Sequence, residues 1–214
     1  MRVIVYMSIL NNISISSDLS GLNEDTWKGY INEALEFLTR FQDLDINNIN
    51  VDVIITNNFE NTVNSYLTSE VTLNETTDAI TLSRFQLNNC IGINKEIIIM
   101  NGNNCLELGR SSLISILVHE LVHCIDFQRI ELLNNRFKIS LYPAQTCANN
   151  ITRDINIFFR GWIEMRAAYY DEIYYVVKKD SHSKLIKSCL FVMRKDILLF
   201  YCPDCLGEGN AGWN

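Results

Sequence analysis

Proline, glycine and histidine are scarce in this chain, whose 214 residues include only 2 Pro, 9 Gly and 3 His. So little Pro and Gly, together with the lack of an internal repeat, excludes collagen-like and low-complexity chains and indicates no flexible hinge between separate domains. We therefore expect a single domain over residues 1–214, with two lobes of about 1–133 and 134–214.

Long apolar runs are also absent. The longest, at 97–100 and 197–202, fall far short of the roughly 18–20 residues needed to cross a bilayer, so we expect no membrane span. The first twelve residues turn polar at Asn11 and lack a small-residue cleavage pattern, which predicts a strand and not a secretory signal. Seven Cys without such a signal favour reduced thiols, and hence a cytoplasmic protein, over a disulfide framework.

Positive charge is in deficit, since 18 Lys and Arg face 25 Asp and Glu and leave a formal net charge of −7. A general nucleic-acid-binding protein needs an excess of Lys and Arg to displace the counterions of the phosphate backbone. A group of Lys and Arg at 178–195 is interpreted as a solvated helix face. We therefore expect no nucleic-acid partner.

The apolar residues change their period near Ser111, from mixed helical and alternating patterns to a helical pattern only. This change predicts an α+β fold, in which an N-terminal mixed α/β lobe and a C-terminal helical lobe flank a central helix at 111–133. Asn23 is the expected cap of the first helix. The predicted elements are helices at 24–41, 59–68, 111–133, 151–159, 161–179 and 184–201, strands at 49–56, 79–87 and 91–100, and a loop at 134–149.

The central helix carries the motif H-E-x-x-H, as His119, Glu120 and His123. Two His four residues apart lie one turn apart on the same helix face, so both imidazoles can bind one Zn²⁺. Glu120 projects beside the metal, where its carboxylate can take a proton from the metal-bound water. The sequence therefore predicts a zinc site with Glu120 as a general base.

A catalytic zinc usually takes three protein ligands and keeps one position for water. Glu164 is the expected third ligand, because it lies on a predicted helix 41 residues after His123 and its apolar neighbours suggest a buried setting. The extended metzincin pattern is excluded, since it needs a His or Asp where Arg129 stands and a Gly in place of Asp126. Asp126 and Asp171 both remain candidates for the carboxylate that orients a ligand His.

These residues resemble the gluzincin metallopeptidases, whose pattern is H-E-x-x-H followed by a Glu on a downstream helix. The resemblance implies a zincin-like fold and a zinc-dependent endopeptidase, with His119, His123 and Glu164 as ligands and a peptide or protein as substrate. Many gluzincins carry an Asp four residues after that Glu, where this chain has Ala168. The segments HELVHCID and EMRAA are also similar to the mitochondrial processing-peptidase and chaperone family that matures an ATP synthase subunit.

Other roles stay open at the level of sequence. A strand at 79–87 or 91–100 would line the cleft, and an extended substrate would pair with it. Cys105 is a rival ligand, and Cys202 and Cys205 form a lone C-x-x-C that we interpret as free thiols. Alternative functions are a zinc-stabilised binding or chaperone-like protein with an idle site, or a zinc amidase for small substrates. The candidates for stabilising an oxyanion are Arg160, Arg166, Tyr169, Tyr170 and His182.

Overall fold

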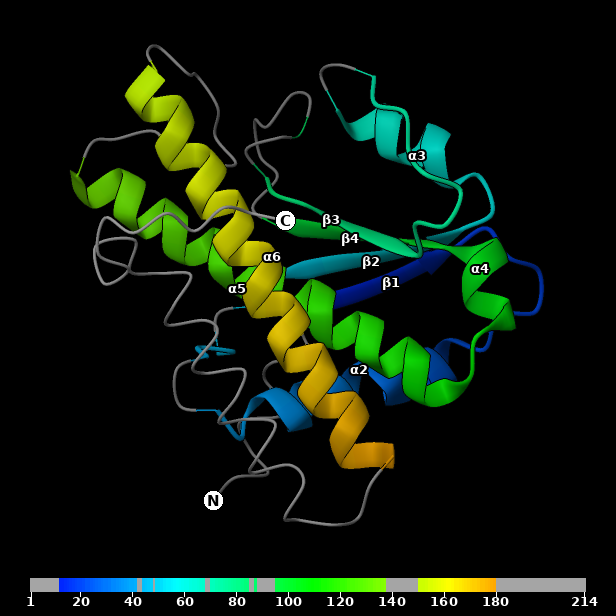
Figure 1. Ribbon diagram of the computed structural model, residues 1–214. Coiled ribbons are helices and arrows are strands. Elements are labelled where there is room, and N and C mark those ends of the chain that lie inside the picture. The colour runs from blue at the N-terminus through cyan, green and yellow to red at the C-terminus, as the bar shows by residue number, and fades with distance from the viewer. Residues whose placement is uncertain are drawn as a thin grey trace, which may run out of the picture.

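The computed structural model describes residues 12–41, 44–47, 49–67, 70–84, 87, 95–137 and 150–179. These residues form a mixed structure of helices around one four-stranded sheet, which confirms the α+β class (Figure 1). The elements are β1 (Ile13–Ser17), α2 (Glu24–Leu38), β2 (Val51–Thr56), α3 (Phe59–Tyr66), β3 (Ala79–Leu82), β4 (Glu96–Asn101), α4 (Gly102–Glu107), α5 (Arg110–Phe137) and α6 (Asn150–Lys179).

The sheet has the strand order β1-β2-β4-β3. β1, β2 and β4 are parallel, whereas β3 runs antiparallel to β4 and forms one edge of the sheet. β4 lies between β2 and β3 and is buried along its whole length, as the continuous apolar run at 97–100 predicts for a central strand. Among the residues that the structure describes, no strand pairs with the outer side of β3.

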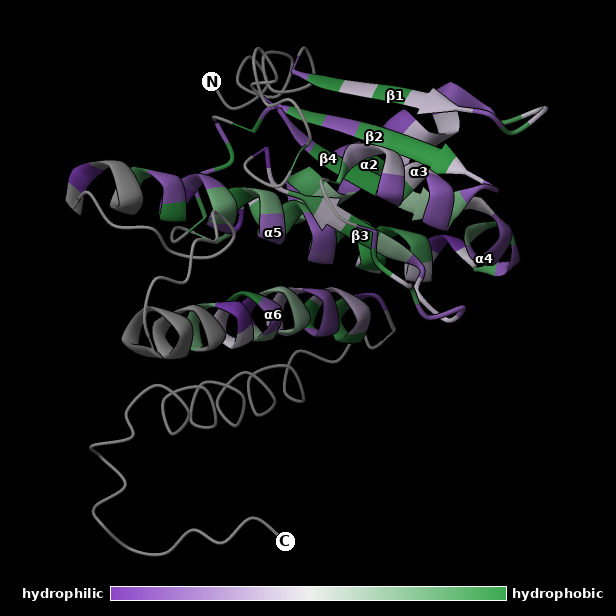
Figure 2. Cartoon of the chain, turned by 90° about the horizontal axis from the view of Figure 1, so that it is seen from above, coloured by the Kyte–Doolittle hydropathy of each residue, from purple (hydrophilic) through white to green (hydrophobic). Residues whose placement is uncertain are grey.

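The side chains of β4 alternate between two apolar clusters, one on each face of the sheet. Ile98 and Met100 belong to a large cluster that also includes residues of α2, α5 and α6. Ile97 and Ile99 pack with residues of α3 on the opposite face. Viewed from above, the sheet, α5 and α6 form successive layers, with α5 in the middle (Figure 2). The central helix is therefore covered by the sheet on one side and by α6 on the other.

α2 begins and ends where simple rules of helix capping place it. The side chain of Asn23 accepts a hydrogen bond from the backbone N–H of Thr26 at 3.1 Å, which confirms the predicted cap. The helix ends at Leu38, three residues earlier than the predicted end at residue 41. Its apolar stripe, from Trp27 to Leu38, is buried against the main cluster.

Glu33 of α2 connects three helices through its carboxylate. It accepts a hydrogen bond from the Tyr174 hydroxyl of α6 at 2.9 Å, and pairs with Arg110 of α5 at 2.7 Å and with Lys178 of α6. Burial alone would raise the pKa of Glu33, but its bonds to Lys178, Arg110 and Tyr174 outweigh that effect and lower the pKa to about 2. This network fixes the C-terminal half of α6 to the rest of the fold.

α6 is one continuous helix, and the predicted break between 151–159 and 161–179 is wrong. Gly161 lies at the junction of the two predicted helices, and glycine costs roughly 1 kcal/mol in a helix interior. Burial of Ile163, Ala167 and Tyr170, all at 3% exposure or less, offsets that cost by packing the helix against its neighbours.

The other predicted boundaries are met in part. β3 ends at Leu82, earlier than expected, and β4 spans Glu96–Asn101, whereas residues 91–94 of its predicted range lie outside the described residues. The short helix α4 was not predicted. Predictions for residues 1–11, most of the loop at 134–149 and the helix at 184–201 fall outside the described residues. Within the described part of the chain, no helix is long and apolar enough to cross a membrane.

Candidate metal centre and cleft

The two His of the motif lie side by side on α5. Their ring centroids are 4.7 Å apart, and both Nε2 atoms face the carboxylate of Glu164 on α6. Oε2 of Glu164 is 3.8 Å from Nε2 of His119 and 3.5 Å from Nε2 of His123. The structure thus brings together the three ligands predicted from the sequence, with one candidate donor atom from each within 4.8 Å of the others.

The donor set fits a zinc ion. Ligands that hold zinc tetrahedrally at 2.0–2.2 Å lie roughly 3.3–3.5 Å from one another, close to the separations between Glu164 and the two His. Two imidazoles and one carboxylate are the ligand types of a catalytic zinc, and three of them leave a fourth position open. His119, His123 and Glu164 therefore could hold one zinc ion after only small movements.

Glu164 is more exposed than the sequence suggested. Its side chain is 56% accessible and faces the cleft, so the expectation of a buried setting, based on its apolar neighbours, is wrong. Those neighbours lie on other faces of α6: Ile163 is buried against α5, and Trp162 is half-buried beside it. The adjacent imidazoles of His119 and His123 nevertheless hold the pKa of Glu164 well below its usual range.

Asp171 provides the carboxylate that orients His119. Its Oδ2 lies 2.8 Å from Nδ1 of His119, which leaves Nε2 of the same ring directed toward Glu164. Burial tends to lower the pKa of His119, but the hydrogen bond to Asp171 and the nearby carboxylate of Glu164 outweigh it and raise the pKa to about 10. The arrangement is a carboxylate–histidine pair of the kind that fixes the tautomer and orientation of a metal ligand.

Asp126, the other candidate, has a different partner. Its side chain is fully buried and accepts a hydrogen bond from Nε of Arg166 at 2.9 Å. Arg166 in turn lies between the rings of Trp162 and Tyr170, at 5.0 and 5.7 Å from their centroids. Asp126 therefore joins α5 to α6 through an ion pair in which its own carboxylate is fully buried.

Glu120 lies beside the candidate metal ligands and contacts the sheet through its side chain. The hydroxyl of Thr81 on β3 is 2.6 Å from Oε2 of Glu120, whose residue is only 6% exposed. Sequence reasoning missed Thr81 as an individual residue. The available signal was the strand at 79–87, which we expected to line the cleft, and a hydroxyl side chain within it.

The three candidate ligands and Glu120 line a cleft of about 480 Å³. One wall is β3, and the opposite wall comes from α5 and α6. An apolar lip, formed by Leu67, Val71 and Leu73, lies above β3. The side-chain amide of Asn64 fixes this lip, because it donates to the carbonyl of Val71 at 3.0 Å and accepts from its N–H at 2.8 Å. The remaining lining residues are Thr72, Ala79, Ile80, Thr81, Leu82, Phe127 and Arg160.

Of the five oxyanion candidates, Arg160 lines the cleft. Arg166 is engaged with Asp126, and Tyr170 is 3% exposed and packs against Phe41. Tyr169 packs edge-on against Tyr170. His182 lies outside the described residues.

The rival metal ligand does not join the group. Cys105 is buried on α4, with Sγ 3.8 Å from the carbonyl of Asp78, and burial raises the pKa of its thiol to about 12. A thiol with that pKa is a poor metal ligand at neutral pH, since zinc binds the thiolate. Cys202 and Cys205 fall outside the described residues.

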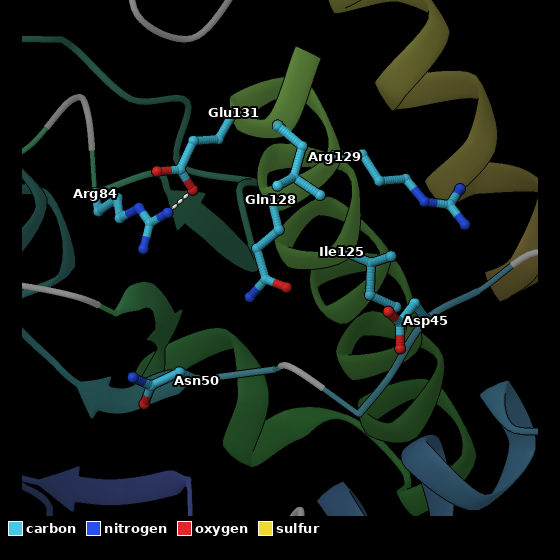
Figure 3. Close-up of a pocket in the computed structure, with 8 residues that line it drawn as sticks. Asp45, Asn50, Arg84, Ile125, Gln128, Arg129 and Glu131 are labelled. Carbon is cyan, nitrogen blue, oxygen red and sulfur yellow. Dashed lines mark ion pairs between the residues drawn. The ribbon is translucent and has the colours of Figure 1, made fainter. Parts of the chain in front are cut away.

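A second cavity, of about 380 Å³, lies beside the C-terminal half of α5 (Figure 3). Arg84 and Glu131 form an ion pair at its rim, and Gln128 points into it. Arg129 directs its guanidinium away from that pair. With Asp45 and Leu132 also in the lining, charges of both signs and apolar surface alternate around the cavity.

No family model matches this chain, and neither does any curated protein or solved structure with which it was compared. What the site can do therefore follows from its geometry and from the chemistry of its side chains.

Proposed function

We propose that this protein is a zinc-dependent endopeptidase with a zincin-like architecture and a gluzincin ligand set. The observation that carries the proposal is the convergence of four side chains: His119, His123 and Glu164 face one point, with Glu120 beside them. The antiparallel edge strand over the motif helix, and the second helix that supplies the third ligand, support the zincin-like assignment.

Three residues around the metal position, Glu120, Thr81 and Asp171, each have a definable role in the proposed peptide hydrolysis. Bound zinc supplies a Lewis acid, which polarises a carbonyl and lowers the pKa of water. Glu120 accepts a proton from the attacking water and returns it to the leaving amine. Thr81 binds one oxygen of the Glu120 carboxylate, which leaves the other oxygen available for that proton. Asp171 keeps Nε2 of His119 directed at the metal position.

The shape of the cleft favours a peptide over a small amide. Its floor is polar, its lip is apolar, and the open edge of β3 offers backbone groups that suit an extended chain. A purely structural zinc site would have no use for Glu120, nor for the hydrogen bond that holds it. Both features favour the endopeptidase over an idle binding protein or a small-substrate amidase.

The test combines metal analysis with digestion of a peptide library. The purified wild-type chain should contain one zinc per molecule and cleave library peptides. Glu120→Gln should retain zinc and lose about 10²–10⁴-fold in rate, since glutamine cannot accept the proton. A wild-type chain that cleaves nothing, or a Glu120→Gln variant that cleaves at the wild-type rate, would overturn the mechanism.

The ligand set is tested separately. His123→Ala and Glu164→Ala should each lose stoichiometric zinc, because three ligands are the minimum for a tight catalytic site. Glu172→Ala is the matched control, since Glu172 is an exposed carboxylate on the same helix and lies outside the cleft lining. Full zinc occupancy in His123→Ala would contradict the assignment.

A further inference from the structure

The outer edge of β3 presents a defined set of backbone groups to the cleft. The N–H of Asn101 donates to the carbonyl of Asp78 at 2.7 Å, so these two residues form a hydrogen-bonded pair of the β3–β4 ladder. Such pairs alternate along an antiparallel ladder, and the register therefore directs the N–H and C=O of Ile80 and Leu82 toward β4. Those of Ala79 and Thr81 point outward, where an extended peptide can pair with them.

β3 and α5 run in the same direction along the cleft. At the start of β3, the carbonyl of Asp78 meets Cys105, just before α5 begins. Thr81 meets Glu120 in the middle of α5, and Arg84 pairs with Glu131 near its end. A peptide that pairs antiparallel with β3, which is the more stable mode per residue, thus has its N-terminal residues over the C-terminal half of α5.

α6 runs opposite to α5. Asp171 contacts His119, whereas Arg166 contacts Asp126, about two turns further along α5. Arg160 precedes Glu164 by about one helical turn, or roughly 5–6 Å, and therefore lies on the side of the metal ligands toward the C-terminal half of α5. This is the side on which an antiparallel peptide carries the residues before its scissile bond.

Arg160 is also distinctive in charge. Among the cleft-lining residues of the described part of the chain it is the only Lys or Arg, and it is exposed. The apolar lip of Leu67, Val71 and Leu73 lines the same cleft. Successive side chains of an extended peptide point to opposite sides, so one side chain can meet the lip while the next meets the guanidinium.

On the basis of the function proposed above, we propose that Arg160 selects peptides with an Asp or Glu one to three residues before the scissile bond, next to an apolar residue that contacts the lip. One helical turn corresponds to between one and two residues of an extended chain at 3.2–3.4 Å per residue, and the Arg side chain adds reach. The guanidinium can bind the carboxylate with two parallel hydrogen bonds, a geometry that an amide does not match.

The experiment compares cleavage maps and kinetics of the full zinc-loaded chain. Wild type should enrich Asp and Glu at the three positions before the cleaved bond, and Arg160→Glu should lose that enrichment. On a matched pair of peptides, Glu against Gln at the preferred position, Arg160→Glu should lower kcat/KM about 10- to 100-fold for the Glu peptide, through KM, as expected for a charge-assisted hydrogen bond. The Gln peptide should change little.

Arg40→Glu is the control, since Arg40 is an exposed arginine just after α2 and lines no part of the cleft. It should retain the wild-type cleavage map. Cleavage without enrichment of acidic residues would overturn the proposal. So would an equal loss of kcat on both peptides in Arg160→Glu, which would assign Arg160 to the oxyanion.

Binding separates this proposal from the peptidase itself. An array of 12-residue peptides with alternating acidic and apolar residues, beside the same peptides with Gln or Asn in place of the acids, is probed with zinc-loaded Glu120→Gln protein. Binding of this protein to the acidic peptides supports the proposal if a second substitution, Arg160→Glu, abolishes it. This outcome supports the proposal even if wild type cleaves nothing. Equal retention on acidic and amide peptides overturns it even if the protein proves to be a peptidase.

Discussion

The hydroxyl of Thr81 lies 2.6 Å from Oε2 of Glu120, so the edge strand of the sheet and the central helix meet at the proposed general base. A carboxylate on a helix could adopt several rotamers above the metal position. The bond from Thr81 restricts it to one, because both residues are at most 7% exposed and have little room to move. The strand that would bind substrate therefore also positions the base.

Thr81→Val tests this positioning role. Valine has nearly the shape of threonine but cannot donate a hydrogen bond, so Oε2 of Glu120 loses its partner. We expect kcat to fall about 10-fold, near the lower bound for loss of a hydrogen bond to a charged group, with zinc content unchanged. Thr81→Ser keeps the hydroxyl and should stay within a few-fold of wild type. Equal rates for the Val variant and wild type would assign Thr81 to packing alone.

Asp171→Asn and Asp126→Asn should have different consequences. The first removes the carboxylate bonded to His119, and we expect zinc affinity to fall about 10- to 100-fold with little loss of stability. The second leaves the buried Arg166 charge without its partner, and we expect a loss of about 3–5 kcal/mol in the free energy of unfolding. Competition with a metal chelator and urea denaturation measure the two effects.

The two variants serve as controls for each other. A stability loss in Asp171→Asn that matched Asp126→Asn would mean that both carboxylates are structural. A larger loss of zinc affinity in folded Asp126→Asn than in Asp171→Asn would mean that the orienting residue is Asp126.

Glu96 makes the stability of the fold depend on pH. It is 2% exposed at the start of β4, and burial raises its pKa from 4.5 to about 7, although hydrogen bonds from Arg84 and Ser83 oppose the shift. The folded state thus holds the proton more tightly than the unfolded state. The stability from this group is complete below about pH 4.5 and is lost as the pH rises to about 7.

Glu96→Gln should therefore flatten the pH dependence of unfolding in that window. A glutamine keeps an acceptor for the backbone N–H of Arg84 but never ionises, so the variant should gain up to about 3 kcal/mol on wild type between pH 4.5 and 7. Urea denaturation at several pH values measures it, with Glu24→Gln, an exposed residue, as the control. An unchanged slope for Glu96→Gln would contradict the prediction.

Gly161→Ala tests the continuity of α6. A Cβ at this position would meet no heavy atom within 4 Å, so alanine should stabilise a continuous helix by about 0.5–1 kcal/mol. Gly21→Ala is the contrasting control: its φ of 87° disfavours any side chain, and we expect a loss of about 1 kcal/mol there. A loss of stability in Gly161→Ala would indicate that the helix is interrupted near this residue, in agreement with the separate helices predicted at 151–159 and 161–179.

The elements with strong local signals were predictable. The alternating apolar residues at 49–56 predicted β2, and the apolar helix face that follows the cap at Asn23 predicted α2, each within a few residues. Both patterns lie within the element that they predict, so the local sequence is sufficient. Gly161 shows the converse. Its local preference is against a helix, whereas α6 is held by packing between residues distant in sequence, which no local pattern encodes.

The same difference between local and distant signals applies to the residues of the candidate site. The spacing of His119, Glu120 and His123 alone places them on adjacent positions of one helix. Asp126 and Asp171 could not be told apart, because the choice depends on Arg166, which lies 40 residues from Asp126 and has no local signal for that contact. The sequence pointed to Glu164 because its apolar neighbours suggested burial, but the side chain is exposed. Its position opposite the two His depends on the antiparallel packing of α5 and α6.

The division of the metal ligands between two helices has a thermodynamic consequence. His119 and His123 belong to α5, whereas Glu164 and the orienting Asp171 belong to α6. An ion held by both helices acts as a cross-link between distant parts of the chain that forms only in the folded state. By mass action, unfolding would then have to release the ion, and the melting temperature would rise with the logarithm of the free zinc concentration above the dissociation constant. Folding and zinc binding would therefore be thermodynamically coupled.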